Sequence, residues 1–305
     1  MIPKRRGYVL VTSLALLVLS STLLISMGRA AIARTTHARQ SQEELQRRWG
    51  EISCRRAILP FAETILTQLE KRQQRPIAIH RAVIRLGAQE FNLIVADEQA
   101  KANINALLDL TDKDRAESQL RSTLSGSGLA AQVRLRPSNI PATYPTTRAV
   151  ILPRLISSFG QILDSTAPQN LFASHGSSPA PAELLTMWGD GTMNIRRASS
   201  ASLALLDSPP LTQIDIRRVI EVRNKLYLPN QIAPAPSAAP LPADPIRGLL
   251  ASADIAPNKM NLHLKTATKC HSLWIIVRDG RRQWYSLEVL DRTEDGRPRS
   301  ESFVW

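Results

Sequence analysis

Aromatic residues and cysteines are scarce in this chain of 305 residues. Phe, Trp and Tyr make up 5% of the sequence, so any hydrophobic core has to be built mainly from aliphatic side chains. The two cysteines, Cys54 and Cys270, are too few for a disulfide framework and lack the spacing of a zinc site. They either pair, if they lie outside the cytoplasm, or remain two separate buried thiols.

The motifs of the common enzyme classes are missing as well. The five histidines are dispersed, and the sequence contains no G-x-S-x-G, P-loop or H-E-x-x-H motif. Asp97 and Glu98 could form a catalytic carboxylate pair, but adjacent residues at the end of a strand point in different directions. We therefore expect no enzymatic activity and no cofactor.

The net charge of +13 raises the question of nucleic-acid binding. The basic residues, however, are scattered and do not form a basic arm. Isolated arginine pairs occur in four different segments, at 55–56, 196–197, 217–218 and 281–282. We interpret these arginines as solvated side chains on a basic surface and expect no nucleic-acid partner.

The clearest signal is a long apolar run near the N-terminus. Residues 8–28 carry no charge, and roughly 20 apolar helical residues cross the bilayer core of about 30 Å. Lys4, Arg5 and Arg6 precede this run and favour a cytoplasmic amino end. The rest of the chain is then expected on the other side of the membrane.

Three interpretations of this segment are open. A secretory signal peptide would be cut after the apolar run, and Ala31 lies in a passable cleavage sequence. A plain signal anchor would not be cut at all. A prepilin-type leader would be cut before the run, at Gly7, which directly follows the basic cluster.

The junction Lys4-Arg5-Arg6-Gly7/Tyr8 resembles a prepilin leader. Ordinary pilins and major pseudopilins carry a glutamate as the fifth residue after the cut, where this chain has Thr12. In this respect the chain resembles the minor pseudopilin K (GspK) family of type II secretion systems, which usually lacks that glutamate. Two internal segments add to the resemblance: one contains Asp97, Glu98, Lys101, Asn103 and Asn105, and the other Gly189, Asp190, Gly191 and Asn194.

The resemblance implies a role at the tip of a pseudopilus. It implies cleavage by a prepilin peptidase after Gly7 and methylation of Tyr8. A carboxylate in lipid is costly unless it is paired, so an uncharged Thr12 suits a subunit with no neighbour above it. The implied partners are the other minor pseudopilins, the major pseudopilin and membrane lipid. The implied location is the inner membrane, crossed once, with the N-terminus cytoplasmic and the later domains periplasmic.

The fold class expected from the resemblance is α+β, with a long pilin-like N-terminal helix packed on an antiparallel sheet and a large inserted helical domain like a SAM or helix-hairpin-helix module. The expected regions are a leader (1–7), a transmembrane helix (8–28), the pilin helix and first strands (29–99), the inserted helical domain (100–227), a Pro/Ala linker (228–246) and the C-terminal strands (247–305).

Local patterns predict the individual elements. Ile58, Ala62, Ile65 and Leu69 form an apolar stripe within a helix over 40–74, which Gly50 and Pro60 should bend or interrupt. Further helices are expected over 112–124, with Thr111 as N-cap, and over 153–163, 200–206 and 212–225. Strands are expected over 82–86, 90–96, 184–188, 260–265, 273–278 and 283–290, the last two joined by an Asp279-Gly280 turn, with a loose tail from Arg292.

Two binding alternatives follow from other features. The helix pair around 205–225 resembles a helix-hairpin-helix, which leaves open a pilin-like component of another assembly, such as a DNA-uptake pilus. Its hairpin contains Pro209 and Pro210 and no glycine, so it lacks the backbone N–H donors that bind phosphate. Oxygen-bearing residues between Asp97 and Asp114 could bind calcium, but their spacing matches no calcium loop. Turn and cap chemistry explains them equally well, and we predict no metal.

Overall fold

The computed structural model describes ten stretches of the chain, and it divides into two compact units, residues 1–52 and 53–305. The described residues are 6–87, 89–138, 155–164, 168–172, 179–205, 212–227, 245–255, 264–279, 282–292 and 298–304. The predicted Pro/Ala linker and the Pro209-Pro210 hairpin therefore lie almost wholly outside the described residues.

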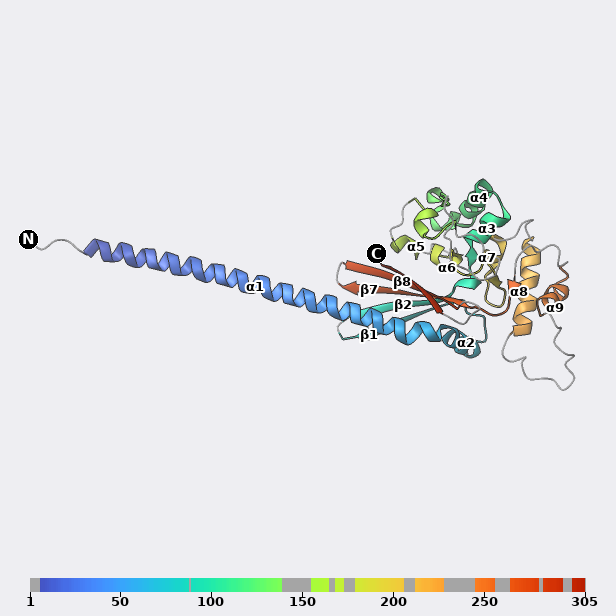
Figure 1. Ribbon diagram of the computed structural model, residues 1–305, viewed down its shortest axis with the longest axis horizontal. Coiled ribbons are helices and arrows are strands. Elements are labelled where there is room, and N and C mark those ends of the chain that lie inside the picture. The colour runs from blue at the N-terminus through green and yellow to red at the C-terminus, as the bar shows by residue number, and fades with distance from the viewer. Residues whose placement is uncertain are drawn as a thin grey trace, which may run out of the picture. The chain divides into compact units, whose positions relative to one another are not determined.

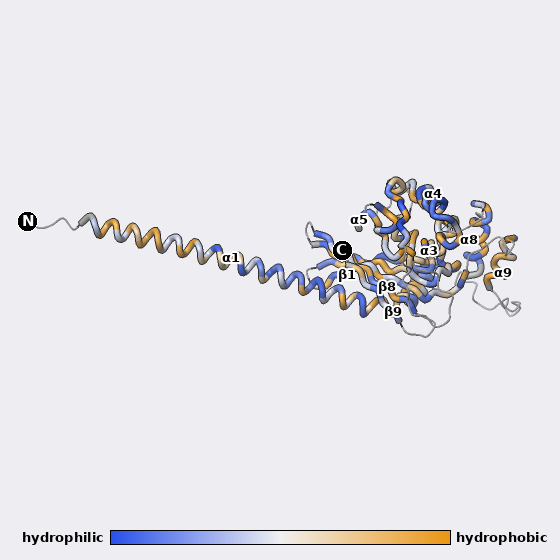
Figure 2. Tube along the Cα trace, turned by 45° about the horizontal axis from the view of Figure 1, so that its top comes forward, coloured by the Kyte–Doolittle hydropathy of each residue, from blue (hydrophilic) through white to orange (hydrophobic). Residues whose placement is uncertain are grey.

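The first unit is the greater part of one helix, α1 (Arg6–Ile58). Among the described residues, one helix is long and apolar enough to cross a bilayer, and its apolar part begins at Tyr8. Figure 2 shows this part in orange and pale colours, and blue, hydrophilic residues follow further along the helix. Hydroxyl groups within the stretch donate hydrogen bonds to backbone carbonyls of the preceding turn, including those of Thr12, Ser13, Ser21, Thr22 and Ser26.

The end of α1 leads into the second unit through a break at Pro60. The 3₁₀ turn η1 (Leu59–Phe61) separates α1 from α2 (Ala62–Gln73). The break was expected, because proline removes one backbone donor and clashes with the preceding turn. Gly50, in contrast, does not interrupt α1. The buried side chain in the middle of α2 is Leu66 and not Ile65.

The sheet has five strands in the order β1-β2-β7-β8-β9, and every neighbouring pair is antiparallel. Its two N-terminal strands were predicted from their patterns, as was the β7–β8 hairpin. The tail was not: residues 298–304 pair with β8, although the sequence had indicated a loose end. The bounds are β1 (Ile79–Leu86), β2 (Gln89–Asp97), β7 (Cys270–Asp279), β8 (Arg282–Arg292) and β9 (Pro298–Val304).

Each face of the sheet carries its own hydrophobic core. Leu93 and Val95 of β2 point to one face and pack with Leu66 of α2, whereas Ile94 points to the other. On β7 the neighbours alternate in the same way, with Trp274 on the face opposite α2. Figure 1 shows α2 along one side of the sheet and the helices of the inserted segment on the other. The two cysteine thiols are both buried but lie in different cores, Cys54 with α2 and Cys270 with the inserted segment.

The inserted segment between β2 and β7 consists of short elements and shares its core with the sheet. Two parallel pairs, β3–β4 and β5–β6, join its parts. The elements are η2 (Glu98–Ala100), β3 (Ala102–Asn103), α3 (Ile104–Leu110), α4 (Lys113–Thr123), η3 (Ser125–Ser127), η4 (Ala130–Gln132), η5 (Phe159–Gln161), α5 (Pro168–Leu171), α6 (Pro181–Leu184), β4 (Leu185–Thr186), β5 (Met193–Asn194), α7 (Ser200–Leu205), α8 (Gln213–Tyr227), α9 (Pro245–Ser252) and β6 (Leu264–Lys265).

Several local predictions for this segment need correction. The N-cap of α4 is Asp112, whose side chain accepts from the Arg115 amide, and not Thr111. The described part of the predicted helix over 153–163 contains only the single turn η5. The predicted strand over 184–188 is reduced to two residues preceded by α6. The helices α7 and α8 confirm their predictions to within two residues.

Candidate functional site: a buried polar network between the sheet and the inserted segment

The residues that suggested a family motif meet where β2 ends. Asp97 is completely buried there and accepts four hydrogen bonds. One oxygen accepts from the Ala100 amide at 3.2 Å and from the Thr268 hydroxyl at 2.7 Å, and the other from Asn194 Nδ2 at 2.8 Å and Arg197 at 3.3 Å. A buried carboxylate needs such donors because it has lost its water. Asp97 therefore ties the end of strand β2 to three places in the inserted segment, at Ala100, at Asn194 and Arg197, and at Thr268.

Glu98 points elsewhere, as expected for the residue next to Asp97. Its Oε1 accepts from Lys101 Nζ at 2.5 Å and from the hydroxyl of Ser272 on β7. All three side chains are buried. The other oxygen, Oε2, has no hydrogen-bond partner among the described residues. The Glu98–Lys101 pair closes the turn η2 against β7.

The Gly189-Asp190-Gly191 segment forms a tight turn beside Gln99. Both glycines have positive φ values, of 84° and 78°, which only glycine adopts without strain. Asp190 accepts from Gln99 Nε2 at 2.7 Å and from Lys265 Nζ at 2.6 Å. A Cβ at position 189 would lie 3.5 Å from the Gln99 side chain. The turn therefore joins η2, through Gln99, to strand β6, through Lys265.

The asparagines of the first motif are caps and bridges. Asn103 begins α3, and its Oδ1 accepts from the amides of Asn105 and Ala106 at 2.9 and 3.2 Å. Its Nδ2 donates to the Trp188 carbonyl at 2.9 Å. Asn105 accepts from the Ile156 amide at 2.9 Å and donates to the Ile156 carbonyl at 3.0 Å. Both side chains thus hold chain segments that are far apart in sequence.

Asn194 repeats the local arrangement of Asn103. Its Oδ1 accepts from the amide two residues later, that of Arg196, at 3.2 Å. Its Nδ2 reaches across to Asp97. Asn103 and Asn194, each followed by an isoleucine, therefore form two similar side-chain-to-backbone turns.

The centre of the network is Arg197, which the sequence interpretation had wrongly assigned to a solvated surface. Its side chain is completely buried. It binds Glu70 with Nε at 2.7 Å, Glu63 with Nη1 at 2.5 Å, and Asp97 at 3.3 Å. The neighbouring Arg196 also pairs with Glu70, and His271 Nε2 lies 3.1 Å from Glu63. One guanidinium thus joins α2, β2 and the inserted segment.

Sequence reasoning missed Glu63 and Glu70 as well. They lie seven residues apart on α2, next to its apolar stripe, and so share one face of the helix. A carboxylate next to the buried apolar stripe of a helix is itself close to the core, and a carboxylate there is normally paired with a cation from another part of the chain. The sequence does not say which of the 39 Lys and Arg residues supplies that cation, because Arg197 is 127 residues from Glu70.

The electrostatics follow from this pairing. Burial opposes ionisation of Glu63, yet hydrogen bonds from His271 and Arg197 lower its pKa to about 2. Burial likewise opposes ionisation of Glu70, and Arg197 again outweighs it and lowers the pKa. At the other end of the network Lys265 and Thr192 outweigh burial and lower the pKa of Asp190. Burial by itself would lower the pKa of the Arg197 guanidinium. The hydrogen bonds to Glu70 and Glu63 outweigh burial, so the pKa is raised above its ordinary value.

The arrangement is suited to holding segments together. Within the described residues, no group of three or more His, Cys, Asp or Glu side chains is placed to hold a metal ion. Among the candidate calcium ligands between Asp97 and Asp114, both oxygens of Asp97 and Oε1 of Glu98 accept hydrogen bonds from protein donors. The network unites Asp97, Glu98, Lys101, Asn103, Asn105, Gly189, Asp190, Gly191 and Asn194 within one region of the second unit.

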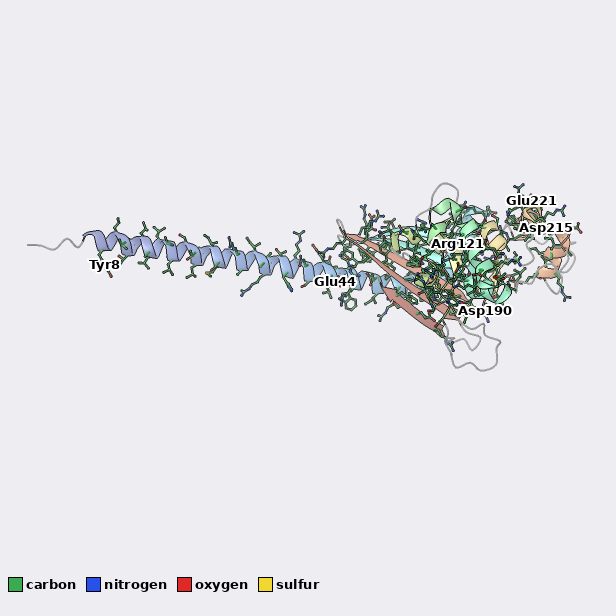
Figure 3. The ribbon with its side chains drawn as sticks, turned by 90° about the horizontal axis from the view of Figure 1, so that it is seen from above. Tyr8, Glu44, Arg121, Asp190, Asp215 and Glu221 are labelled. Atoms are coloured by element: carbon green, nitrogen blue, oxygen red, sulfur yellow. The ribbon has the colours of Figure 1, made fainter. Side chains whose placement is uncertain are left out.

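The other predicted site residues belong to the first unit. Gly7 and Tyr8 lie in the first turn of α1, and Tyr8 is exposed (Figure 3). Thr12 follows one turn later, and its hydroxyl donates to the carbonyls of Tyr8 and Val9 at 3.1 and 3.0 Å. Figure 3 labels Tyr8, which belongs to the predicted processing site in the first unit, and Asp190, which belongs to the polar network in the second unit.

The described structure defines an α+β protein with a pilin-like arrangement, in which the end of α1 and α2 pack on a five-stranded antiparallel sheet that also carries extra helices. Among solved structures, a chain of "the GspK-GspI-GspJ complex from enterotoxigenic Escherichia coli Type 2 Secretion System" is similar, with a TM-score of 0.41 and 14% identity over 88% of this chain and 99% of that chain. No protein family and no curated protein matched the sequence. Because the TM-score is low, we assign the fold class from the observed packing of the end of α1 and of α2 on the antiparallel sheet.

Removing the central cation should destabilise the second unit. Arg197→Met leaves Asp97 buried without a charge partner and leaves Glu70 with Arg196 as its remaining cation, which costs about 3–5 kcal/mol. Urea unfolding of the intact protein in detergent, followed by the fluorescence of the buried Trp188 and Trp274, measures the loss. Arg115→Met, at an exposed position of α4, is the control and should change stability by no more than about 0.5 kcal/mol. Equal effects of the two substitutions would contradict the central role of Arg197.

The same carboxylates should make the second unit sensitive to acid. The folded pKa of Glu63, about 2, is below its ordinary value of 4.5. Its contribution is therefore complete above about pH 4.5, and it is lost as the pH falls towards 2. Glu63→Gln should flatten the decline of unfolding free energy in this window, whereas Glu221→Gln, at an exposed position of α8, should not. A wild-type stability that is constant from pH 5 to about pH 2 would refute this assignment.

Proposed function

We propose that this protein is a minor pseudopilin of a type II secretion system, of the K type, that initiates or caps the pseudopilus tip together with other minor pseudopilins. It is held in the inner membrane by the apolar part of α1, with its amino end in the cytoplasm. Its second unit lies in the periplasm. Processing by a prepilin peptidase after Gly7 leaves Tyr8 as the new, methylated N-terminus.

The observation that carries the proposal is Thr12 at the position of the usual glutamate. Its hydroxyl hydrogen is bonded within its own helix, to the carbonyls of Tyr8 and Val9. It therefore needs no partner from another subunit while it lies in lipid. A charged carboxylate costs roughly 2.5–3.5 kcal/mol at the bilayer centre unless it is paired, and the cost is smaller one turn inside the edge, where Thr12 lies. A subunit with Thr12 suits the one place in a filament where no subunit lies above to provide that pair.

The inserted segment supports the same position. It shares a hydrophobic core with the sheet and is tied to it by Arg197 and Asp97, so it is an integral part of the second unit. An insertion of this size on every subunit would crowd a repeating helical lattice. It is accommodated at a filament end, where there is no next subunit on one side. Its predicted identity as a SAM or helix-hairpin-helix module, with the boundaries 100–227, remains part of the proposal.

The site of cleavage separates this proposal from a signal peptide and from an uncut anchor. Gly7→Leu should block processing, because the peptidase needs a small residue before the cut. Amino-terminal sequencing of the protein isolated from its own membrane should find Tyr8 first in the wild type and Met1 in the variant. Ala31→Leu serves as the control and should leave the cut unchanged. A wild-type chain that starts near Ala31 or at Met1 would refute the pilin-like interpretation.

The residue at position 12 tests the place at the tip. Thr12→Ala should support secretion normally, since the hydroxyl serves only its own helix. Thr12→Glu should be no better than wild type, because the added carboxylate finds no partner at the tip. Secretion in cells carrying each variant is measured together with the ratio of this protein to the main filament subunit by quantitative blotting. Improved assembly with Thr12→Glu, or equal abundance of the two proteins, would contradict the tip position.

A further inference from the structure

Two arginines follow the apolar run of α1 without any carboxylate near them. The sequence contains no Asp or Glu from Met1 to Gln42, and the first carboxylate is that of Glu43. Arg29 and Arg34 are exposed and have no ion pair among the described residues of the chain. From Arg39 onwards the charges are paired along the helix, beginning with Arg39 and Glu43 at 3.1 Å.

The spacing of these arginines matches the outer headgroup layer. At 1.5 Å per helical residue, Arg29 lies about 32 Å and Arg34 about 39 Å beyond Tyr8. With Tyr8 at the inner edge of the hydrocarbon core, that core ends after about 30 Å and the headgroup region several ångströms later. Arg29 then lies among the headgroups, and Arg34 lies just outside them.

The direction of helical side chains brings both guanidinium groups towards the lipid. In an α-helix the side chains tilt towards the N-terminus, which for α1 is the membrane side. The five-residue step from Arg29 to Arg34 turns the helix by about 140°, so the two side chains leave it on different sides. Figure 3 shows side chains projecting from different sides of α1 between Tyr8 and Glu44. Their apolar stems can lie along the helix while the charged ends reach phosphate.

These charges also act against the expected orientation of the protein. Basic residues favour the cytoplasmic side of a membrane helix, and Arg29 and Arg34 lie on the opposite side from Lys4, Arg5 and Arg6. Anionic headgroups at the outer surface would offset this disadvantage. We propose that Arg29 and Arg34 bind the phosphates of anionic lipids in the outer leaflet, the leaflet from which α1 emerges towards Glu43. The proposal rests on the membrane insertion proposed above.

The test uses the intact protein in phosphatidylcholine vesicles that carry phosphatidylglycerol only in the leaflet nearest the second unit. Spin-labelled phosphatidylglycerol and phosphatidylcholine report which lipid the helix prefers. The wild type should prefer phosphatidylglycerol. Arg29→Gln/Arg34→Gln should lower this preference about fivefold or more, the effect expected for basic residues at an anionic surface. Added salt should weaken the wild-type preference as well.

Matched variants separate charge from helix structure. Arg29→Lys/Arg34→Lys should keep the preference, since the charge is retained. Arg48→Gln removes an exposed arginine of the same helix about 20 Å further out, beyond the reach of surface charge, and should have no effect. An unchanged lipid preference in Arg29→Gln/Arg34→Gln would overturn the proposal. If that variant keeps its lipid preference but no longer co-purifies with an acidic protein, the two arginines bind a protein and the lipid proposal is wrong. Failure of the wild type to float with the vesicles would refute the membrane anchor itself.

Discussion

The second unit depends on the buried guanidinium of Arg197. Arg197 is inaccessible to solvent and binds carboxylates from α2 and from the end of β2. A buried charge is tolerated only when it is paired and hydrogen-bonded, so these partners have to be in place together. Because α2 and the inserted segment contact opposite faces of the sheet, the pairing takes place at the end of the sheet, where Asp97 terminates β2. The polar turns around Asp97, Asn103 and Asn194 are arranged about that point.

A sheet that is covered on both faces explains the apolar character of its central strands. In β2 and β7, neighbouring residues such as Leu93 and Ile94, or Leu273 and Trp274, lie in different cores and are all buried. Such strands show continuous hydrophobicity, because neither face meets water. The edge strand β1 differs, with Val83 and Leu86 exposed. The central strands therefore bind the inserted segment to the rest of the unit through apolar contacts, and the polar network adds directional contacts at one end.

The first unit follows different rules. Along the apolar part of α1 the hydroxyl groups of Thr12 and its neighbours bond to the helix itself, which suits an environment without water. After Gln42 the helix carries ion pairs such as Arg48 with Glu44 at 2.7 Å, which suit an aqueous surface. Arg29 and Arg34 lie between these two regimes. The side chains of α1 thus change from apolar to charged along the helix.

Features that depend on neighbouring residues were determined by the sequence itself. The apolar run from Tyr8, the break at Pro60, the β7–β8 hairpin and the helices α7 and α8 all follow from local patterns, because their hydrogen bonds and apolar periodicity lie within a few residues. The turn at Gly189 and Gly191 is also a local feature, and the positive φ values of both residues explain why it uses glycine.

Only the tertiary structure decided the remainder. Strand β9 contains Pro298, Arg299 and Glu301 and has little strand character of its own, so its pairing with β8 determines its conformation. The predicted strand over 184–188 is reduced to the two residues of β4, which pair with the two residues of β3. The burial of Arg197 could not be read from an Arg-Arg pair, because its partners at Glu63 and Glu70 are more than 120 residues away. Ion pairs between neighbouring helical turns follow from local spacing, but a pair such as Arg197 with Glu70 is set by long-range packing, which the local sequence does not encode.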